Sequence, residues 1–141
     1  MDRTPNYRFA TEKPDHIMVS ISGDARSSMT VTWRASSDVS GGYIEVYEQG
    51  GEKIRFDAVV KSFKSDVNVS NIFWAKADNL KSGTRYYYTC GDSVNRSDEF
   101  YFDTQEDDLS KFRFIVISDH QKDTDHYDPD YSQLNAFLKD V

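Results

Sequence analysis

The sequence predicts a mainly β protein, an antiparallel β-sandwich followed by the first β-α unit of an α/β domain. Over most of the chain, short runs of alternating apolar and polar residues are separated by turn residues, which is the pattern of half-buried strands. Aromatic residues make up 14% of the 141 residues, and β-sheets favour such side chains. Towards the C-terminus, an apolar run precedes residues at helical spacing, so we expect the architecture to change there.

The sandwich is predicted over residues 14–104, after a polar lead-in at 1–13. Seven short strands are expected, with Gly, Ser and Asp at the turns between them. They cover 17–21, 29–33, 43–47, 54–63, 72–77, 86–90 and 99–102, and the stretch at 54–63 is the least regular. Trp33 and Trp74 are both expected in the core, because large aromatic side chains dominate core packing.

One corner of the sandwich has a recognisable pattern. Leu80 and Gly83 precede three consecutive tyrosines that begin at Tyr86. A tyrosine at this place in a sandwich can return its hydroxyl to the backbone near the preceding turn, and we expect Tyr86 to do so. With the Met-Thr-Val-Thr-Trp run at 29–33, this pattern resembles the fibronectin type III domain. That resemblance covers roughly residues 15–104 and implies a fold rather than a chemistry.

A second, incomplete domain is predicted at 112–141, after a charged linker at 105–111. The run at 112–118 (F-R-F-I-V-I-S) is typical of a parallel strand that is buried on both faces. Further on, Asp128 precedes a proline, which together form a helix start signal. The residues at helical spacing after it are Leu134, Phe137, Leu138 and Val141. We therefore expect this chain to be the front part of a larger enzyme.

Metal-ligating residues are predicted directly after the apolar run. Asp119 and Gln121 are two residues apart, and a loop that leaves a strand can direct both side chains at one ion. In open α/β sheets, ligands bind at the carboxyl ends of strands. Hard metal ions prefer oxygen ligands such as these. His120 could contact substrate phosphate, although a loop histidine is more commonly solvated, and an Asp here could also simply cap a turn.

The order of these motifs resembles the calcineurin-like metallophosphoesterases, and within them the purple acid phosphatases. A fibronectin-like domain ahead of a strand-then-Asp-x-His/Gln motif carries the resemblance, which covers most of the chain. It implies phosphate-ester hydrolysis at a dinuclear centre of Fe, Mn or Zn, with Asp119 and Gln121 as metal ligands. Ser-Asp-His-Gln at 118–121 differs from the Gly-Asp-x-Gly of purple acid phosphatases, so the subfamily stays open.

The resemblance also implies that this chain lacks some of the metal ligands of the family. The later motifs of the family, which supply the remaining metal ligands, do not occur in these 141 residues. We therefore expect an incomplete metal centre and no activity from this chain alone. The substrate and the compartment stay open, although the resemblance favours a secreted or cell-surface protein.

The net charge restricts the partners that we expect, and the single cysteine restricts the chemistry. The formal net charge is −7, which disfavours non-specific binding to nucleic acid or to an anionic membrane. Cys90, the only cysteine, falls in a predicted strand, where a packed thiol is expected rather than a nucleophile. The apolar strand at 112–118 has no predicted neighbour, so we expect a homo-oligomer that forms through residues 112–141, or disorder there.

A different class of function remains open. The sandwich could act alone as an adhesion module or as a carbohydrate- or protein-binding module with no catalysis. The segment after residue 104 separates the two interpretations, because a plain binding module has no use for a buried strand, an aspartate at its end and an amphipathic helix. The sequence therefore favours the phosphoesterase.

Overall fold

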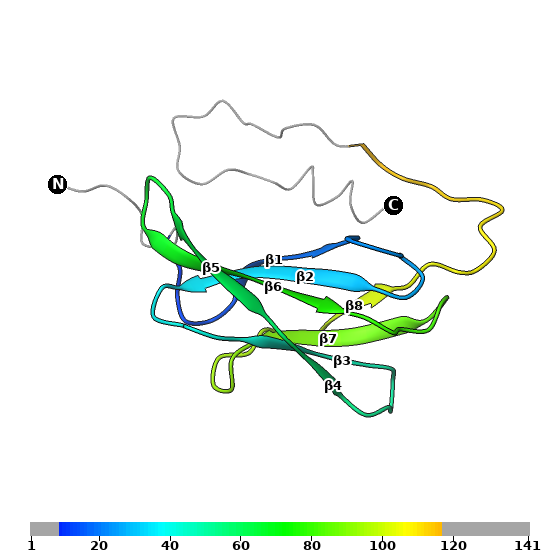
Figure 1. The fold of residues 1–141 in the computed structure, drawn as a ribbon, viewed down its shortest axis with the longest axis horizontal. Coiled ribbons are helices and arrows are strands. Elements are labelled where there is room, and N and C mark those ends of the chain that lie inside the picture. The colour runs from blue at the N-terminus through cyan, green and yellow to red at the C-terminus, as the bar shows by residue number, and fades with distance from the viewer. Residues whose placement is uncertain (1–8, 117–141) are drawn as a thin grey trace. The chain divides into compact units, whose positions relative to one another are not determined.

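The computed structural model describes residues 9–116 (Figure 1). The chain divides into two units, 1–110 and 111–141, and the first contains every strand of the described part. The strands are β1 (Asp15–Ser20), β2 (Met29–Ser36), β3 (Tyr43–Tyr47), β4 (Ile54–Asp57), β5 (Val59–Lys64), β6 (Val69–Ala77), β7 (Arg85–Gly91) and β8 (Phe100–Asp103). No helix occurs within residues 9–116, so this part contains none that could cross a membrane.

The strands form two four-stranded sheets, with orders β1-β2-β6-β5 and β4-β3-β7-β8. Every pairing between them is antiparallel. In Figure 1 the two sheets of unit 1 lie one above the other as two layers. The strands β2, β3, β6 and β7 bury alternate residues between the layers over most of their length, because successive side chains of a strand point to opposite faces. The predicted antiparallel β-sandwich is therefore confirmed.

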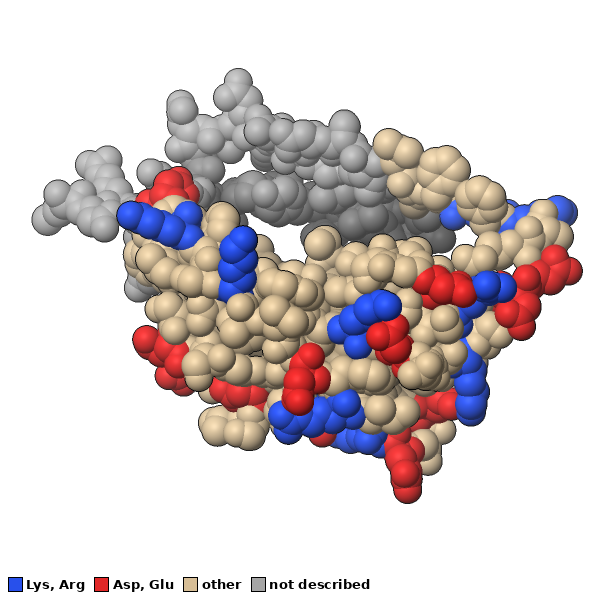
Figure 2. Space-filling view, viewed as in Figure 1, with Lys and Arg blue, Asp and Glu red and all other residues tan. Residues whose placement is uncertain are grey.

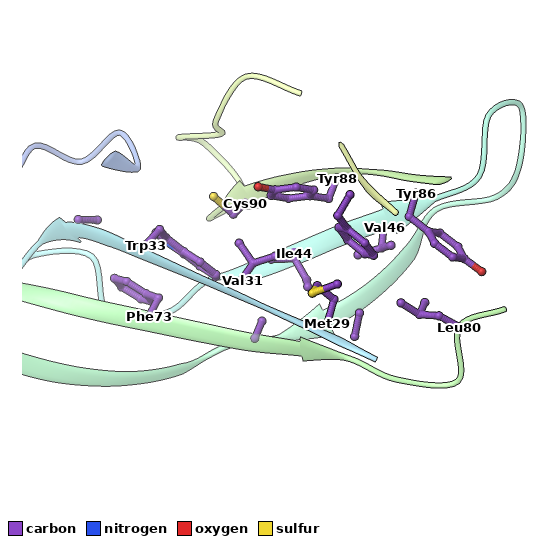
Figure 3. Packing of buried hydrophobic residues seen from close by; sticks show 14 residues of the cluster. Met29, Val31, Trp33, Ile44, Val46, Phe73, Leu80, Tyr86, Tyr88 and Cys90 are labelled. Carbon is purple, nitrogen blue, oxygen red and sulfur yellow. The ribbon is translucent and has the colours of Figure 1, made fainter. Parts of the chain in front are cut away.

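The core lies between the sheets (Figure 3). Trp33 and Phe73 are direct partners on β2 and β6, and their rings stack with centroids 5.3 Å apart and an interplanar angle of 8°. Both side chains are fully buried, so this pair removes much apolar surface from water. The other core residues are Met29, Val31, Ala35, Ile44, Val46, Ala75, Ala77, Leu80, Tyr86, Tyr88, Cys90 and Phe102. Cys90 is thus a packed thiol, as predicted, and burial raises its pKa to about 11.

The predicted tyrosine corner is present. The Lys81 amide donates a hydrogen bond to the Tyr86 hydroxyl oxygen at 3.0 Å. Thr104 ties the same corner to the end of β8, because its hydroxyl donates to the Lys81 carbonyl at 2.6 Å and accepts from the Thr84 amide at 2.9 Å. The corner is therefore held by side chains that satisfy backbone groups in the turn.

The predicted number of strands is wrong for one stretch of the chain. The stretch at 54–63 is not one strand, because it divides at Ala58 into β4, which pairs with β3, and β5, which pairs with β6. The Ala58 amide donates to the Gly42 carbonyl at 2.9 Å, one register position beyond the Tyr43–Asp57 pair of β3 and β4. The chain crosses here from one sheet to the other, and no Gly or Pro marks the crossing in the sequence.

The prediction that Trp74 lies in the core is also wrong. Trp74 is 36% exposed, whereas its neighbours Phe73 and Ala75 are buried. Because the side-chain period of a strand is two, residues on either side of an inward-facing position must face outward. Phe73 stacks on Trp33, so Trp74 lies on the outer side of its sheet.

The apolar run predicted as a strand at 112–118 is described only as far as residue 116. Residues 112–116 pair with no strand in the described part of the chain, and all of them are exposed. A parallel strand is held by hydrogen bonds to neighbouring strands, and none of the eight described strands supplies them. The remainder of this run and the predicted helix lie outside the described residues.

Candidate functional site

The predicted metal ligands cannot be placed. Asp119, His120 and Gln121 lie outside the described residues. Within residues 9–116, no group of three or more His, Cys, Asp or Glu side chains could hold a metal ion. This part of the chain therefore does not by itself provide the donor set of a dinuclear centre, and the functional candidates within it are the outer surfaces of the two sheets.

The outer side of the β1-β2-β6-β5 sheet is apolar and exposed, and is called the open face below. Its exposed residues include Met18 at 60%, Val59 at 56%, Phe63 at 54% and Trp74 at 36%. The register places Val59 beside Trp74, and Phe63 beside Ser70, across β5 and β6. Scattered single apolar residues are normal on a surface, whereas several on one sheet face make that face a candidate site of interaction.

A hollow of about 260 Å³ lies on the open face. It is lined by His16, Thr32, Trp33, Arg34, Phe63, Ser65, Ser70 and Ile72. Ser70 is only 2% exposed, so the hollow reaches down to the sheet. Pockets for small ligands are commonly about 300–1,000 Å³, and this hollow is smaller. Its size suits one large side chain of a partner better than a separate small molecule.

Arg34, which lines the hollow, forms an ion pair with Asp15. Arg34 Nε and a terminal guanidinium nitrogen donate to the two carboxylate oxygens of Asp15 at 2.7 Å each. Burial alone would raise the pKa of Asp15, but the hydrogen bonds from Arg34 and the contact with His16 together lower it. The same bonds raise the pKa of Arg34. The pair is fixed in a two-point geometry, so it supplies a rigid polar rim.

The entry to β1 is irregular at this rim. His16 has a φ of +49°, which a residue with a side chain adopts only rarely. The pairing register of β1 with β2 shifts between Asp15 and Met18, as at a β-bulge. The His16 ring nitrogen Nδ1 lies 3.0 Å from Asp15 Oδ1. Asp15 and Met18 are three residues apart but pair with Arg34 and Thr32, which are two apart, so the bulge places both Asp15 and Met18 on the open face.

The outer side of the β4-β3-β7-β8 sheet differs, and is called the paired face. Tyr47, Tyr87 and Tyr101 are cross-strand neighbours, with ring centroids 6.1 and 6.5 Å apart. The Lys53 ammonium lies 5.3 Å from the Tyr47 ring and the Arg85 guanidinium 4.2 Å from the Tyr101 ring. The row of rings is therefore covered at both ends by cations, which aromatic faces attract.

Charges on the paired face are matched. Ion pairs join Arg55 with Asp57 at 2.7 Å, Arg85 with Asp103 at 2.8 Å, and both Lys53 and Arg96 with Glu45 at 3.3 Å. Tyr47 donates a hydrogen bond to Glu99, which raises the pKa of Tyr47 to about 12. Blue and red side chains adjoin one another across the lower part of Figure 2.

Arg96 is the most connected residue of the paired face. Its guanidinium donates to the carbonyl oxygens of Tyr43, Thr89 and Gly91 at 3.2–3.3 Å. It also lies 4.3 Å from the Tyr43 ring. At the same place Gly91 has a φ of +132°, and a Cβ there would lie 2.0 Å from the Asn95 carbonyl oxygen. Glycine is therefore required where the loop after β7 folds back.

A second hollow, of about 370 Å³, lies among loops of the sandwich and contains acidic residues. Its lining includes Glu12, Asp38, Asp92 and Asn95. The Asp92 carboxylate already accepts hydrogen bonds from the amides of Val94 and Asn95, at 2.7 and 2.5 Å, and the bond from the Asn95 amide is the main cause of its lowered pKa. Asp92 therefore stabilises its own loop.

Together these features define the class of protein: a β-sandwich domain whose described part has an exposed apolar sheet face and no group of side chains that could hold a metal ion. The family follows from comparison with known proteins. The family model of the purple acid phosphatase N-terminal domain matches residues 14–104, and the chain belongs to this family. No curated protein matches the chain.

Two solved structures are similar to the chain. Purple acid phosphatase PPD1 from yellow lupin (Lupinus luteus) seeds matches with a TM-score of 0.57 and 17% identity, over 67% of this chain and 20% of that chain. At this identity the likeness shows the fold alone. The sensor domain of the anti-sigma factor RsgI4 in Pseudobacteroides cellulosolvens matches with a TM-score of 0.37 and 14% identity, over 77% of this chain and 93% of that chain. A TM-score this low carries no argument.

The open face was not predicted from the sequence. Exposure of Trp74 could have been inferred from the two-residue period, once Phe73 was assigned inward. The free edge of β5 had no such signal, since it depends on the chain changing sheets at Ala58. The predicted family is confirmed, whereas the predicted site residues stay predictions.

Proposed function

We propose that this chain is the N-terminal part of a metal-dependent phosphoesterase and that its sandwich is not itself catalytic. The observation that carries the proposal is the match of residues 14–104 to the purple acid phosphatase N-terminal domain. The chain covers 20% of the solved purple acid phosphatase to which it is similar. The hydrolytic reaction, its phosphate-ester substrate and the dinuclear metal centre are therefore proposed for the whole protein.

In this proposal, Asp119 and Gln121 are metal ligands and His120 lies near the substrate phosphate. A dinuclear centre of Fe, Mn or Zn would supply the positive charge that stabilises displacement at phosphorus. One carboxylate and one amide are too few oxygen ligands for two such ions. We therefore expect the 141 residues alone to be inactive. Nucleic acids and membranes are not proposed as partners, given the acidic net charge.

The test compares two aspartates in the gene product that carries this chain. Asp119→Asn is expected to reduce bound metal and to lower hydrolysis of p-nitrophenyl phosphate by about a hundredfold or more, since it removes a charged ligand. Asp123→Asn, in the same polar stretch, is the matched control and should change neither. Equal metal content and equal activity in the Asp119 variant would reject the assignment.

The described start of the second unit supports a proposed homo-oligomer through residues 112–141. Phe112, Phe114 and Val116 are 71%, 75% and 83% exposed, and a run of exposed apolar side chains favours association. We expect light scattering to give a mass above that of a monomer, and the double substitution Phe112→Asp and Phe114→Asp to reduce it. A monomeric mass for the unsubstituted chain contradicts the proposal.

A second candidate function, a binding module without catalysis, is favoured by the open face. Its exposed apolar residues and its hollow are not covered by any described part of unit 1. The two functions are compatible, since a non-catalytic domain of an enzyme can also bind a partner.

A further inference from the structure

The two sheets end in four edge strands, and they differ in how well they are protected from further pairing. β1 is interrupted by the register shift next to Asp15. β4 and β8 contain only four residues each, and Arg55 and Asp57 place an ion pair on β4. Natural proteins protect their edges by bulges, short strands and charges of this kind.

β5 is the most regular of these edges, because its only protective features of this kind are the charges of Lys61 and Lys64. It has six residues, and its pairing with β6 continues without a shift from Val59 opposite Trp74 to Lys64 opposite Val69. All six residues are exposed, and none is Gly or Pro. In the described part of the chain, β5 has a partner on one side only. Alternate backbone N–H and C=O groups on its other side are therefore available to another strand.

Apolar surface lies beside this edge on the open face. Val59 and Phe63 on β5 are 56% and 54% exposed, and Phe63 also lines the 260 Å³ hollow. A strand added to β5 would place alternate side chains over the same face, because side chains of neighbouring strands are in register. One of these side chains could reach the hollow. Backbone pairing and a side-chain pocket together are the usual components of strand addition.

The strand β5 carries two lysines and no acidic residue. Lys61 and Lys64 form no ion pair with any residue in 9–116. Four other lysines of the sandwich are each paired with a carboxylate: Lys13 with Asp98, Lys53 with Glu45, Lys76 with Asp78, and Lys81 with Glu48. In a chain of net charge −7, two unpaired lysines on one strand favour an acidic occupant.

We propose that β5 binds an extended, acidic segment of a partner protein as an additional strand of the β1-β2-β6-β5 sheet. On the open face the segment would carry a carboxylate next to Lys61, between apolar side chains next to Val59 and Phe63, and on the opposite face it would carry a carboxylate next to Lys64. This interaction is separate from the proposed phosphoesterase activity and does not depend on it.

Two other occupants fit less well. A second copy pairing through β5 would bring four lysines onto one short ladder, and like charges facing each other across strands are destabilising. An anionic membrane would leave the backbone groups of the edge without hydrogen bonds. In addition, two lysines are fewer than the clusters of about 4–8 basic residues that bind anionic lipid.

The experiment uses the 141-residue chain and a short synthetic peptide with blocked ends and the sequence Glu-Val-Ser-Asp-Ser-Val-Glu. Its aspartate and two valines share one face, as Lys61, Val59 and Phe63 do, and a glutamate at either end can lie next to Lys64. Binding is measured by calorimetry, and amide protection by hydrogen exchange followed by NMR. We expect saturable binding together with slowed exchange at alternate amides within 59–64, which is the pattern of a newly paired edge. A peptide of the same pattern, with lysine in place of the acidic residues, should bind more weakly by about tenfold or more.

Charge reversal at the edge tests the assignment independently. The double variant Lys61→Glu and Lys64→Glu should weaken binding of the acidic peptide by roughly tenfold or more and should now bind the lysine peptide. The matched control, Lys13→Glu with Lys53→Glu, reverses two lysines away from β5 and should leave the affinity for both peptides unchanged. An unchanged thermal melting temperature shows that each variant is folded.

Three results would overturn the proposal. The first is no binding of the acidic peptide at any concentration tested. The second is binding that protects amides outside β5 or is equally weakened in the control variant. The third is a dimer whose formation protects the β5 amides, or adsorption to phosphatidylserine vesicles that does so, because either would assign the edge to a different occupant.

Discussion

The two outer surfaces of the sandwich differ in how many of their charged and aromatic side chains have a partner on the same surface. On the paired face, the row of tyrosines is covered by cations, and those cations are bound to carboxylates. On the open face, Met18, Phe63 and Trp74 are exposed, and Lys61 has no carboxylate partner within the described residues. Both surfaces come from antiparallel four-stranded sheets, so sheet architecture alone does not explain the difference.

The comparison shows that aromatic residues on a sheet surface do not by themselves identify a binding site. Tyr101 is 57% exposed, which is similar to Phe63, but the Arg85 guanidinium lies on its ring. Phe63 has no cation or aromatic ring partner in residues 9–116. What distinguishes a surface available to a partner is therefore the lack of a neighbouring group, rather than the number of aromatic side chains.

The largest expected difference in stability is between substitutions of the two tryptophans. Trp33→Ala should lower the free energy of unfolding by about 3–5 kcal/mol, because it leaves a cavity against Phe73. Trp74→Ala should cost less than about 1 kcal/mol, since the side chain already faces solvent. Urea unfolding measures both. Similar losses for the two variants would contradict the assignment of Trp74 to the open face.

An intermediate effect compares a basic residue from each face. Arg96→Ala should lower the free energy of unfolding by about 2–3 kcal/mol, because three backbone carbonyls of the paired face lose a charged donor. Lys61→Ala should change it by less than about 0.5 kcal/mol, as expected for a surface residue that has no ion-pair partner within residues 9–116. Equal and small changes in thermal and urea unfolding would show that the bonds of Arg96 contribute little to stability.

The smallest effect concerns acid stability. The pKa of Asp15 is lower in the folded chain than its ordinary value of 3.8, so the unfolded chain binds more protons in acid. The pair with Arg34 therefore adds stability above that value, and this stability is lost as the pH falls through the lower, folded pKa. Asp15→Asn should cost at most about 1 kcal/mol at neutral pH, after screening by solvent.

The pH dependence provides the check on this pair. In urea unfolding at several pH values, Asp15→Asn and the unsubstituted chain should converge as the pH falls below the folded pKa of Asp15. Asp103→Asn, which removes the partner of Arg85 on the paired face, is the control in a more exposed pair and should have a smaller effect at neutral pH. A constant difference between Asp15→Asn and the unsubstituted chain at all pH values would show that the carboxylate acts through shape rather than charge.

Local sequence patterns predicted most of the sandwich. The Met-Thr-Val-Thr-Trp run at 29–33 places Val31 and Trp33 inward, and the pattern around Leu80 and Gly83 predicted the hydroxyl contact of Tyr86. Both depend on interactions within a strand or across one turn, where a two-residue period or a single glycine suffices. The candidate site could not be predicted in this way, because the metal ligands lie outside the described residues and the open face depends on how the strands are arranged.

By itself, the sequence determined that this chain is an aromatic-rich antiparallel sandwich and which family it belongs to, since alternation and turn residues act over a few positions. Only the tertiary structure decided that the chain changes sheets at Ala58, that β5 is left as a regular edge and that Trp74 faces outward. These features depend on which strands become neighbours. Pairing between distant segments is settled by the packing of both sheets around Trp33 and Phe73, which no local pattern specifies.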